Sequence, residues 1–184
     1  DYSKGDNFST GFTIEAWVRF DSFSESWSRI MEIANGSPVD NILLAHEMTT
    51  NNLAFDIYNN NARVGSIRAN NTLQLDTWQH VAATLDENGA MRLYLNGVEV
   101  STGTASSMPR NVARDIRLGE SFFSNDGHLN GNLDEVRVWS EARSAAEIAR
   151  DHNRFLFGDE EGLTVYWQFN EGIGQEVYNL VDAN

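Results

Sequence analysis

Phe-Thr-Ile-Glu-Ala-Trp-Val-Arg-Phe, residues 12–20, is the stretch of the chain that decides the fold. Apolar side chains occupy every second position in it: Phe12, Ile14, Ala16, Val18 and Phe20. Successive side chains of a β-strand point to opposite faces, so an apolar set with period two indicates a strand with one face in a core. The stretch therefore predicts a sheet that has one buried face and one polar face.

Further strands follow from the same kind of pattern along the chain. The clear ones are 78–85, 91–95, 116–118, 133–139 and 163–169, and the weaker ones are 30–33, 41–45, 53–58 and 63–67. Asn96-Gly97 lies between two apolar runs, and both residues tolerate positive φ, which is typical of a tight hairpin. Many short strands separated by Asn, Asp and Gly favour a sandwich or a jelly roll.

A single helix is predicted, because Ser144 and Glu147 form a capping box and good helix formers follow to about His152. The chain has 184 residues, which suits one domain of generous size. We therefore predict an all-β fold, a jelly-roll sandwich of two antiparallel sheets with one short helix, as a single domain over residues 1–184. The chain opens at Asp1 rather than at methionine, so we expect it to be part of a larger extracellular protein.

The composition of the chain limits the classes of partner that it can bind. The net charge is −14, a field that repels nucleic acid and anionic membrane surfaces and attracts cations. No stretch approaches the ~20 apolar residues that span a bilayer, so we expect no membrane insertion. The chain has no cysteine, which favours a bacterial extracellular or cell-surface protein over a disulfide-bearing animal module.

Three blocks of sequence resemble a known family. They are Phe12–Val18, Trp78–Asp86 followed by Leu93–Gly97, and Gly131–Trp139 followed by Ala142–Ile148. In this order they are similar to laminin-G-like modules of the concanavalin A-like lectin/glucanase superfamily, which implies the jelly roll and a ligand-binding role. The tail Gly162–Gly172 resembles the segment that often opens such a module, so it either supplies a closing strand here or begins a second copy.

Catalysis is not expected, although the superfamily includes glycoside hydrolases. Retaining glycosidases need two carboxyl groups ~5 Å apart, and the Glu-x-Asp-x-x-Glu pattern of the jelly-roll hydrolases does not occur. Asp134 and Glu135 are adjacent, so regular strand geometry predicts that their carboxylates point to opposite faces. The chain also lacks a Gly-x-Ser-x-Gly elbow and a His-Glu-x-x-His motif. We therefore predict a protein that is not an enzyme.

A calcium site is predicted from a second resemblance. Asp40-Asn41 before an apolar strand resembles the Asp-Asn pair that supplies calcium ligands in pentraxins, and Ile116–Glu120 resembles the strand that precedes their second ligand loop. The resemblance implies Ca²⁺ ligands at Asp40, Asn41 and Glu120, with Asn125 and Asp126 in the loop. Asp134 is a further candidate, by likeness to a structural calcium of jelly-roll glycosidases. The alternatives are an Asx turn at Asp40 and a polar strand entrance at Asp134.

Aromatic residues beside that loop are the candidate ligand contacts. Phe122 and Phe123 are adjacent in an otherwise polar loop, and Trp27 lies in a serine-rich stretch. Exposed rings stack on sugar faces, although one phenylalanine could fill the core instead. The other four tryptophans (Trp17, Trp78, Trp139 and Trp167) are assigned to packing.

These observations predict an extracellular, calcium-dependent ligand-binding module for glycans that serves adhesion or substrate targeting. Two alternatives stay open: a protein- or peptide-interaction module of the same fold, with calcium structural or absent, and a structural accessory domain. A sugar reader should show an exposed ring beside the metal, whereas a peptide reader should show a groove or an unpaired sheet edge.

Calcium binding predicts a Ca²⁺-specific rise in the thermal midpoint, because a ligand that binds only the folded state stabilises it. We expect a rise over the midpoint in EDTA, none with Mg²⁺, and its loss in Asp40→Ala and Glu120→Ala. Loss in Asp134→Ala alone would make the metal structural. A midpoint indifferent to both EDTA and calcium would contradict the prediction.

Overall fold

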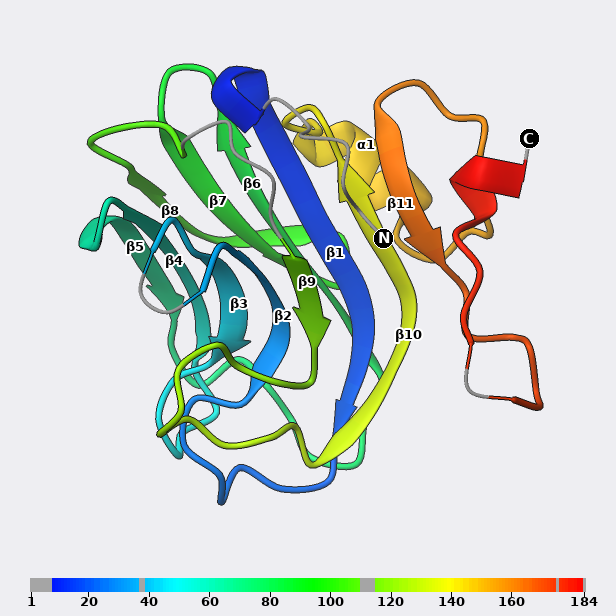
Figure 1. Cartoon of the computed structure of the whole chain (residues 1–184), viewed down its shortest axis with the longest axis horizontal. Coiled ribbons are helices and arrows are strands. Elements are labelled where there is room, and N and C mark those ends of the chain that lie inside the picture. Colours follow the sequence, from blue (N-terminus) through cyan, green and yellow to red (C-terminus); the bar gives the residue numbers. More distant parts are fainter. Residues whose placement is uncertain (1–7, 37–38, 110–114, 175, 184) are drawn as a thin grey trace.

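Residues 11–20 form the strand β1 (Gly11–Phe20), which lies inside a six-stranded antiparallel sheet (Figure 1). A computed structural model describes residues 8–36, 39–109, 115–174 and 176–183. The order of this sheet is β11 (Leu163–Trp167), β10 (Gly131–Trp139), β1, β6 (Gln79–Asp86), β7 (Ala90–Leu95) and β8 (Val98–Thr104). Its strand β1 pairs with β10 on one side and with β6 on the other.

A five-stranded antiparallel sheet packs against the first (Figure 1). Its order is β5 (Ala62–Ala69), β4 (Leu53–Asn59), β3 (Ile42–His46), β2 (Arg29–Ala34) and β9 (Asp115–Leu118). The chain passes from β1 to this sheet for β2–β5 and returns to the six-stranded sheet for β6–β8. It then crosses to the five-stranded sheet for β9 and back to the six-stranded sheet for β10 and β11. The predicted jelly-roll sandwich is confirmed.

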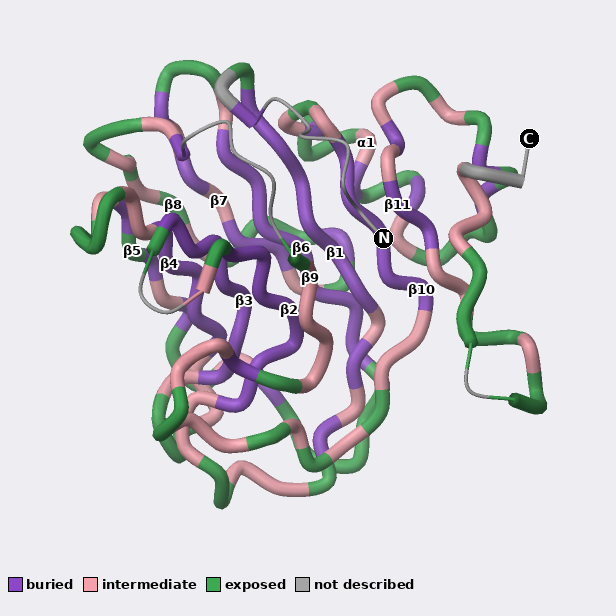
Figure 2. The backbone as a smooth tube through the Cα atoms, viewed as in Figure 1, coloured by how far each residue is buried: buried purple, intermediate pink, exposed green. Residues whose placement is uncertain are grey.

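The core lies between the two sheets, where the inward side chains of both meet. All five alternating residues of β1 are fully buried, and Phe12 meets Phe55 of β4 edge to face with ring centroids 6.1 Å apart. Figure 2 shows that burial follows the strands, while exposed residues gather in the loops and the C-terminal segment. The period-two pattern therefore identified the core face correctly.

Two local predictions are confirmed at the level of backbone geometry. Asn96 and Gly97 have φ of 49° and 80°, as the tight turn between β7 and β8 requires. Ser144 caps α1 (Ala145–Asp151), and Glu147 completes the capping box. Ile148 of this helix packs on Ala82 and Tyr94, on the outer face of the six-stranded sheet.

The C-terminal segment completes the six-stranded sheet. Strand β11 pairs with β10, so residues 163–167 form the edge strand expected from the closing-strand interpretation. The 3-10 turn η2 (Leu180–Ala183) packs beside β11, while a shorter turn, η1 (Phe8–Thr10), precedes β1. Among the described residues, no helix has the length and apolar character that a membrane span needs.

A buried charge network lies on the outer face of the six-stranded sheet. Glu15 of β1 is 2% exposed, accepts a hydrogen bond from Trp139 Nε1 (3.0 Å), and lies 3.4 Å from His80 Nε2 and 3.5 Å from Arg137 Nη1. Burial by itself raises the pKa of Glu15. The hydrogen bonds and charges of His80, Arg137 and Trp139 outweigh burial and lower the pKa from 4.5 to about 2.

This depressed pKa predicts an acid-sensitive fold. Glu15 contributes stability that is complete above pH ~4.5, the unfolded pKa, and is lost as the pH falls toward about 2. We expect Glu15→Gln to lower the free energy of unfolding at pH 7. Between pH ~4.5 and about 2, the free energy of unfolding of the variant should fall by on the order of 3 kcal/mol less than that of the unaltered protein. Urea unfolding at successive pH values measures this. Equal slopes for both proteins would contradict the prediction.

Candidate functional site

The outer face of the five-stranded sheet is organised around one buried carboxylate. Glu32 of β2 is fully buried. Its Oε2 accepts hydrogen bonds from Arg29 Nε (2.9 Å), Ser121 Oγ (3.0 Å) and the Phe122 backbone N–H (3.1 Å), and its Oε1 accepts one from Asn41 Nδ2. These donors come from β2, from the turn before β3 and from the loop after β9. Glu32 therefore fastens that loop onto the sheet.

Arg29 extends this network toward both sides of a shallow hollow. Its guanidinium donates to the carboxylate of Asp126 and to the backbone carbonyl of Trp27. Trp27 has a φ of 57°, a left-handed conformation that few residues adopt without support from their surroundings. The arginine therefore holds Trp27 on one side and the 121–126 loop on the other.

The hollow has a volume of about 200 Å³. It lies over β2, β3, β4 and β5, and its lining comprises Trp27, Arg29, Leu43, Asp56, Tyr58, Arg63, Phe123 and Asp126. Three of these were predicted as site residues: Trp27, Phe123 and Asp126.

Aromatic rings form the walls of this hollow. Tyr58 and Phe123 lie with ring centroids 5.9 Å apart, and Arg29 sits 5.6 Å from the Phe123 centroid. The Arg68 guanidinium lies 5.2 Å from the Trp27 ring. Since each ring is supported by a charged group or another ring, these half-buried walls are held in place before any ligand arrives.

The polar groups of the hollow are also fixed, with one exception. Arg68 binds both oxygens of Asp56 (2.6 and 2.9 Å) and reaches Glu47 (2.8 Å). Arg63 differs, because its side chain is 51% exposed and lies 3.8 Å from Asp56. Arg63 is therefore the cation at the rim that can turn toward a ligand.

The remaining predicted residues lie around the hollow rather than in it. Phe122 stacks on Arg117, with the guanidinium 3.9 Å from its ring centroid, and neither Phe122 nor Phe123 belongs to the core between the sheets. Glu120 is 54% exposed and lies 3.4 Å from Arg117, and Asn125 is exposed. Asp134 belongs to the other sheet.

Two of the predicted calcium ligands, Asp40 and Asp126, have protein partners in this structure. Asp40 accepts a hydrogen bond from the Asn60 backbone N–H (2.7 Å), and Asp126 faces Arg29. Asn41 Oδ1 is buried without a hydrogen-bond partner among the described residues. Within the same residues, no group of three or more His, Cys, Asp or Glu side chains is placed to hold a metal ion. These residues do not fit a calcium cage of carboxylates, and calcium binding stays a prediction.

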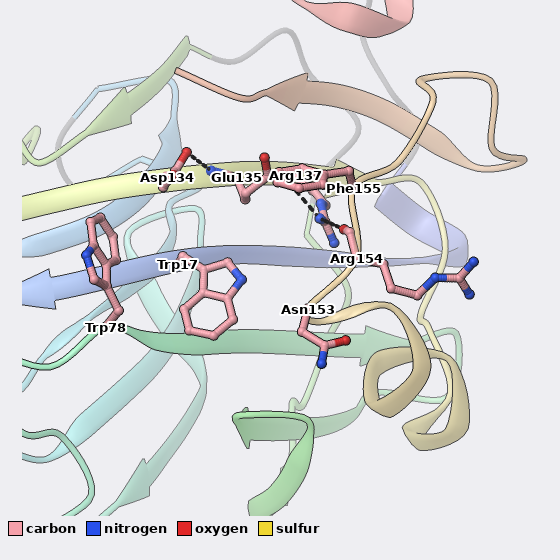
Figure 3. A pocket seen from close by; sticks show the side chains of 8 residues that line it. All are labelled: Trp17, Trp78, Asp134, Glu135, Arg137, Asn153, Arg154 and Phe155. Carbon is pink, nitrogen blue, oxygen red and sulfur yellow. Dashed lines mark hydrogen bonds and ion pairs between the residues drawn. The ribbon is translucent and has the colours of Figure 1, made fainter. Parts of the chain in front are cut away.

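A second hollow, which the sequence did not predict, lies on the outer face of the six-stranded sheet (Figure 3). Its lining includes Trp17, Trp78 and Asp134. Trp17 packs edge to face against His80, whereas Trp78 is 43% exposed, contrary to the packing role expected for it. Asp134 and Glu135 both line it, contrary to the expectation of opposite faces, because β10 has a bulge there. The position of Trp17 opposite the core face of β1 was the available signal.

Comparison with known proteins agrees with this architecture. A family model described as the concanavalin A-like lectin/glucanases superfamily matches residues 3–149. No curated protein matches the chain.

Several solved structures share the fold. A putative carbohydrate-binding protein from Bacteroides ovatus has a TM-score of 0.70 and 20% identity over 94% of this chain. The match covers 50% of that protein, so this chain spans half its length. A CBM40 domain of a Ruminococcus gnavus sialidase, bound to α2,3-sialyllactose, has a TM-score of 0.63 and 15% identity, covering 78% of this chain and 83% of that one.

A SAP-like pentraxin from Limulus polyphemus is also similar, with a TM-score of 0.58 and 16% identity, covering 76% of this chain and 68% of that one. At these identities the likeness shows the fold. The laminin-G-like and pentraxin-like resemblance of the sequence is thus confirmed at that level.

The Glu32 network predicts a large effect from a small substitution. Glu32→Gln removes the buried charge that Arg29 and the loop donors require, so we expect a loss of about 3 kcal/mol of unfolding free energy. Faster hydrogen exchange at residues 121–126 should accompany it. The matched control is Glu120→Gln, an exposed acid in the same loop, which should change stability by less than ~0.5 kcal/mol. Equal effects of the two variants in urea unfolding would contradict the role of Glu32.

Proposed function

Since the chain belongs to the concanavalin A-like lectin/glucanase superfamily, we propose that it is a carbohydrate-binding module whose site is the hollow between Trp27, Tyr58 and Phe123. The observation that carries this proposal is the set of three aromatic walls around charged side chains that are already held in place. Sugar rings present apolar C–H faces to aromatic rings and hydroxyl groups to polar side chains. The hollow offers both kinds of partner within one small volume.

Rigidity is the second support for the proposal. Arg29, Arg68 and Glu32 fix the walls through hydrogen bonds within the protein, so little side-chain freedom is lost when a ligand binds. Asp126 and the rim arginine Arg63 can serve the hydroxyl or carboxylate groups of a sugar. Relatives of the same fold include proteins described with bound sialyllactose and arabinotriose.

Binding without catalysis is part of the proposal. The two carboxylates in the hollow, Asp56 and Asp126, each face an arginine at hydrogen-bond distance. A glycosidase needs one carboxyl group free as acid and another as nucleophile or base. We further propose an extracellular or cell-surface location and a role in adhesion or substrate targeting. The calcium dependence predicted from sequence is an independent part of the proposal, which the metal titration above tests.

Removing the aromatic walls should abolish glycan binding while leaving the fold intact. A glycan array first identifies a ligand. We expect Trp27→Ala and Phe123→Ala each to weaken the affinity for that glycan by about tenfold or more, because well-packed aromatic contacts dominate such interfaces. Titration calorimetry measures the affinity, and near-UV circular dichroism confirms the fold. Trp78→Ala, which removes an exposed indole from the other sheet, should leave the affinity unchanged.

Two results would count against this site. If Trp78→Ala weakens binding and Trp27→Ala does not, the glycan binds the other sheet and the proposed site is wrong. If no glycan binds with or without calcium, the carbohydrate function itself is wrong, and a protein ligand becomes the candidate.

A further inference from the structure

The second hollow has a different chemical character from the first. It measures about 300 Å³ and lies on the outer face of the six-stranded sheet, next to the segment that follows α1 (Figure 3). Its lining consists of Trp17, Trp78, Asp134, Glu135, Arg137, Asn153, Arg154 and Phe155. Three aromatic residues and two carboxylates thus share a single concave surface.

The aromatic groups here present open surface to solvent. Trp78 is 43% exposed and Phe155 is 75% exposed. Trp17 lies between them in Figure 3, and its Nε1 donates a hydrogen bond to the His152 carbonyl (2.8 Å). That bond fixes the indole and leaves part of its ring available to a ligand. Exposed aromatic residues gathered around a hollow, rather than scattered singly, indicate a contact surface.

A β-bulge brings the two carboxylates to the same face. Trp17 pairs with Asp134, whereas Glu15 pairs with Arg137, so β10 has one residue more than β1 in this interval. Glu135 lies within this bulge and has a φ of 51°. In a regular strand the two side chains would point to opposite faces, but the bulge leaves both in the hollow.

Glu135 is a buried acid with spare capacity to accept hydrogen bonds. It is 7% exposed, and its Oε2 accepts hydrogen bonds from Arg137 Nη2 (2.8 Å) and Tyr166 Oη (2.5 Å). Its Oε1 is buried and has no hydrogen-bond partner among the described residues. A buried carboxylate oxygen without a donor is costly, which favours a ligand that adds positive charge nearby.

Asp134 has no cation of its own. Its Oδ1 accepts only the Glu135 backbone N–H (2.9 Å), and no basic side chain of the described residues lies within ion-pair distance. Burial raises the pKa of Asp134 and the charge of Glu135 adds to the rise, although the hydrogen bond opposes them. The carboxylate is therefore held beside a second negative charge without compensation.

Of the two arginines of the hollow, Arg137 is held by buried acids, and Arg154 is an exposed residue at the rim. Arg137 is buried between Glu15 and Glu135, at 3.5 and 2.8 Å. Arg154 is 60% exposed and lies 3.7 Å from Asp151, and Figure 3 shows its guanidinium turned away from both indoles. The positive charges near the hollow thus leave Asp134 unpaired, in a chain of net charge −14.

We propose that this hollow binds an alkylammonium group, with Trp17 and Trp78 contacting the cation and Asp134 pairing with it. Aromatic faces attract ammonium ions through their quadrupole, and a carboxylate at the rim adds an ion pair. The group belongs either to a lysine side chain of a partner protein or to a small quaternary ammonium compound. This site is separate from the proposed glycan site, on the opposite sheet of the sandwich.

Indole N–H signals in ¹H–¹⁵N spectra test this proposal directly. The five tryptophans give resolvable signals that Trp→Phe variants assign. We expect tetramethylammonium and Nα-acetyl-lysine methylamide to shift the Trp17 and Trp78 signals in a saturable way, with Trp27 unmoved. The stronger of the two probes identifies the source: the lysine derivative indicates a partner side chain, and tetramethylammonium indicates a small quaternary compound.

Charge-matched variants decide whether the carboxylate matters. Asp134→Asn should weaken binding about fivefold at low salt, while Glu120→Gln, which removes the same charge elsewhere, should not change it. The proposal is overturned if a neutral methyl glycoside shifts these signals and neither cation does. It is also overturned if no probe moves them, or if the two variants behave alike. None of these results bears on glycan binding beside Trp27.

Discussion

A single buried carboxylate, that of Glu32, determines the shape of the five-stranded sheet's outer face. Burying a charge is expensive unless hydrogen bonds replace its water, and Glu32 has such donors from three separate segments of the chain. Because these segments all reach the same carboxylate, Glu32 anchors the loop after β9 on the sheet. Arg29 then carries the constraint outward to Trp27 and Asp126.

The consequence is that the walls of the proposed glycan site are already held by protein contacts. The Phe123 and Trp27 rings contact arginines, and acids hold those arginines in place. A substitution at Glu32 should therefore change the positions of these rings. In this arrangement the Arg29 guanidinium lies against the loop carboxylate of Asp126. The likeness to a pentraxin is one of fold, and Arg29 and Glu32 hold the 121–126 loop of this chain on the sheet.

The two outer faces of the sandwich treat charge differently. On the five-stranded sheet both carboxylates of the hollow, Asp56 and Asp126, accept hydrogen bonds from arginines, which leaves aromatic surface and the exposed Arg63 for a ligand. On the six-stranded sheet, the bulge at Glu135 places Asp134, without a counterion among the described residues, in a hollow that Trp17 and Trp78 also line. The two hollows therefore differ in chemistry and lie on opposite faces of the sandwich.

Local patterns in the sequence determined every strand except β8, as well as the Asn96-Gly97 turn and the Ser144 cap, because these depend on side-chain period and on backbone preferences of a few neighbouring residues. The sequence also predicted Trp27 and Phe123 as site residues, because they are aromatic residues in polar stretches, and Asp126, because its loop resembles a calcium loop of pentraxins. It could not show that Glu32, Tyr58, Asp56 and Arg63 join them, since those residues read as ordinary members of strands. Only the tertiary structure decided which strands became neighbours, which acids paired with arginines and where a bulge left Asp134 and Glu135 in the same hollow. Pairing between segments far apart in the chain sets these features, and no local pattern encodes it.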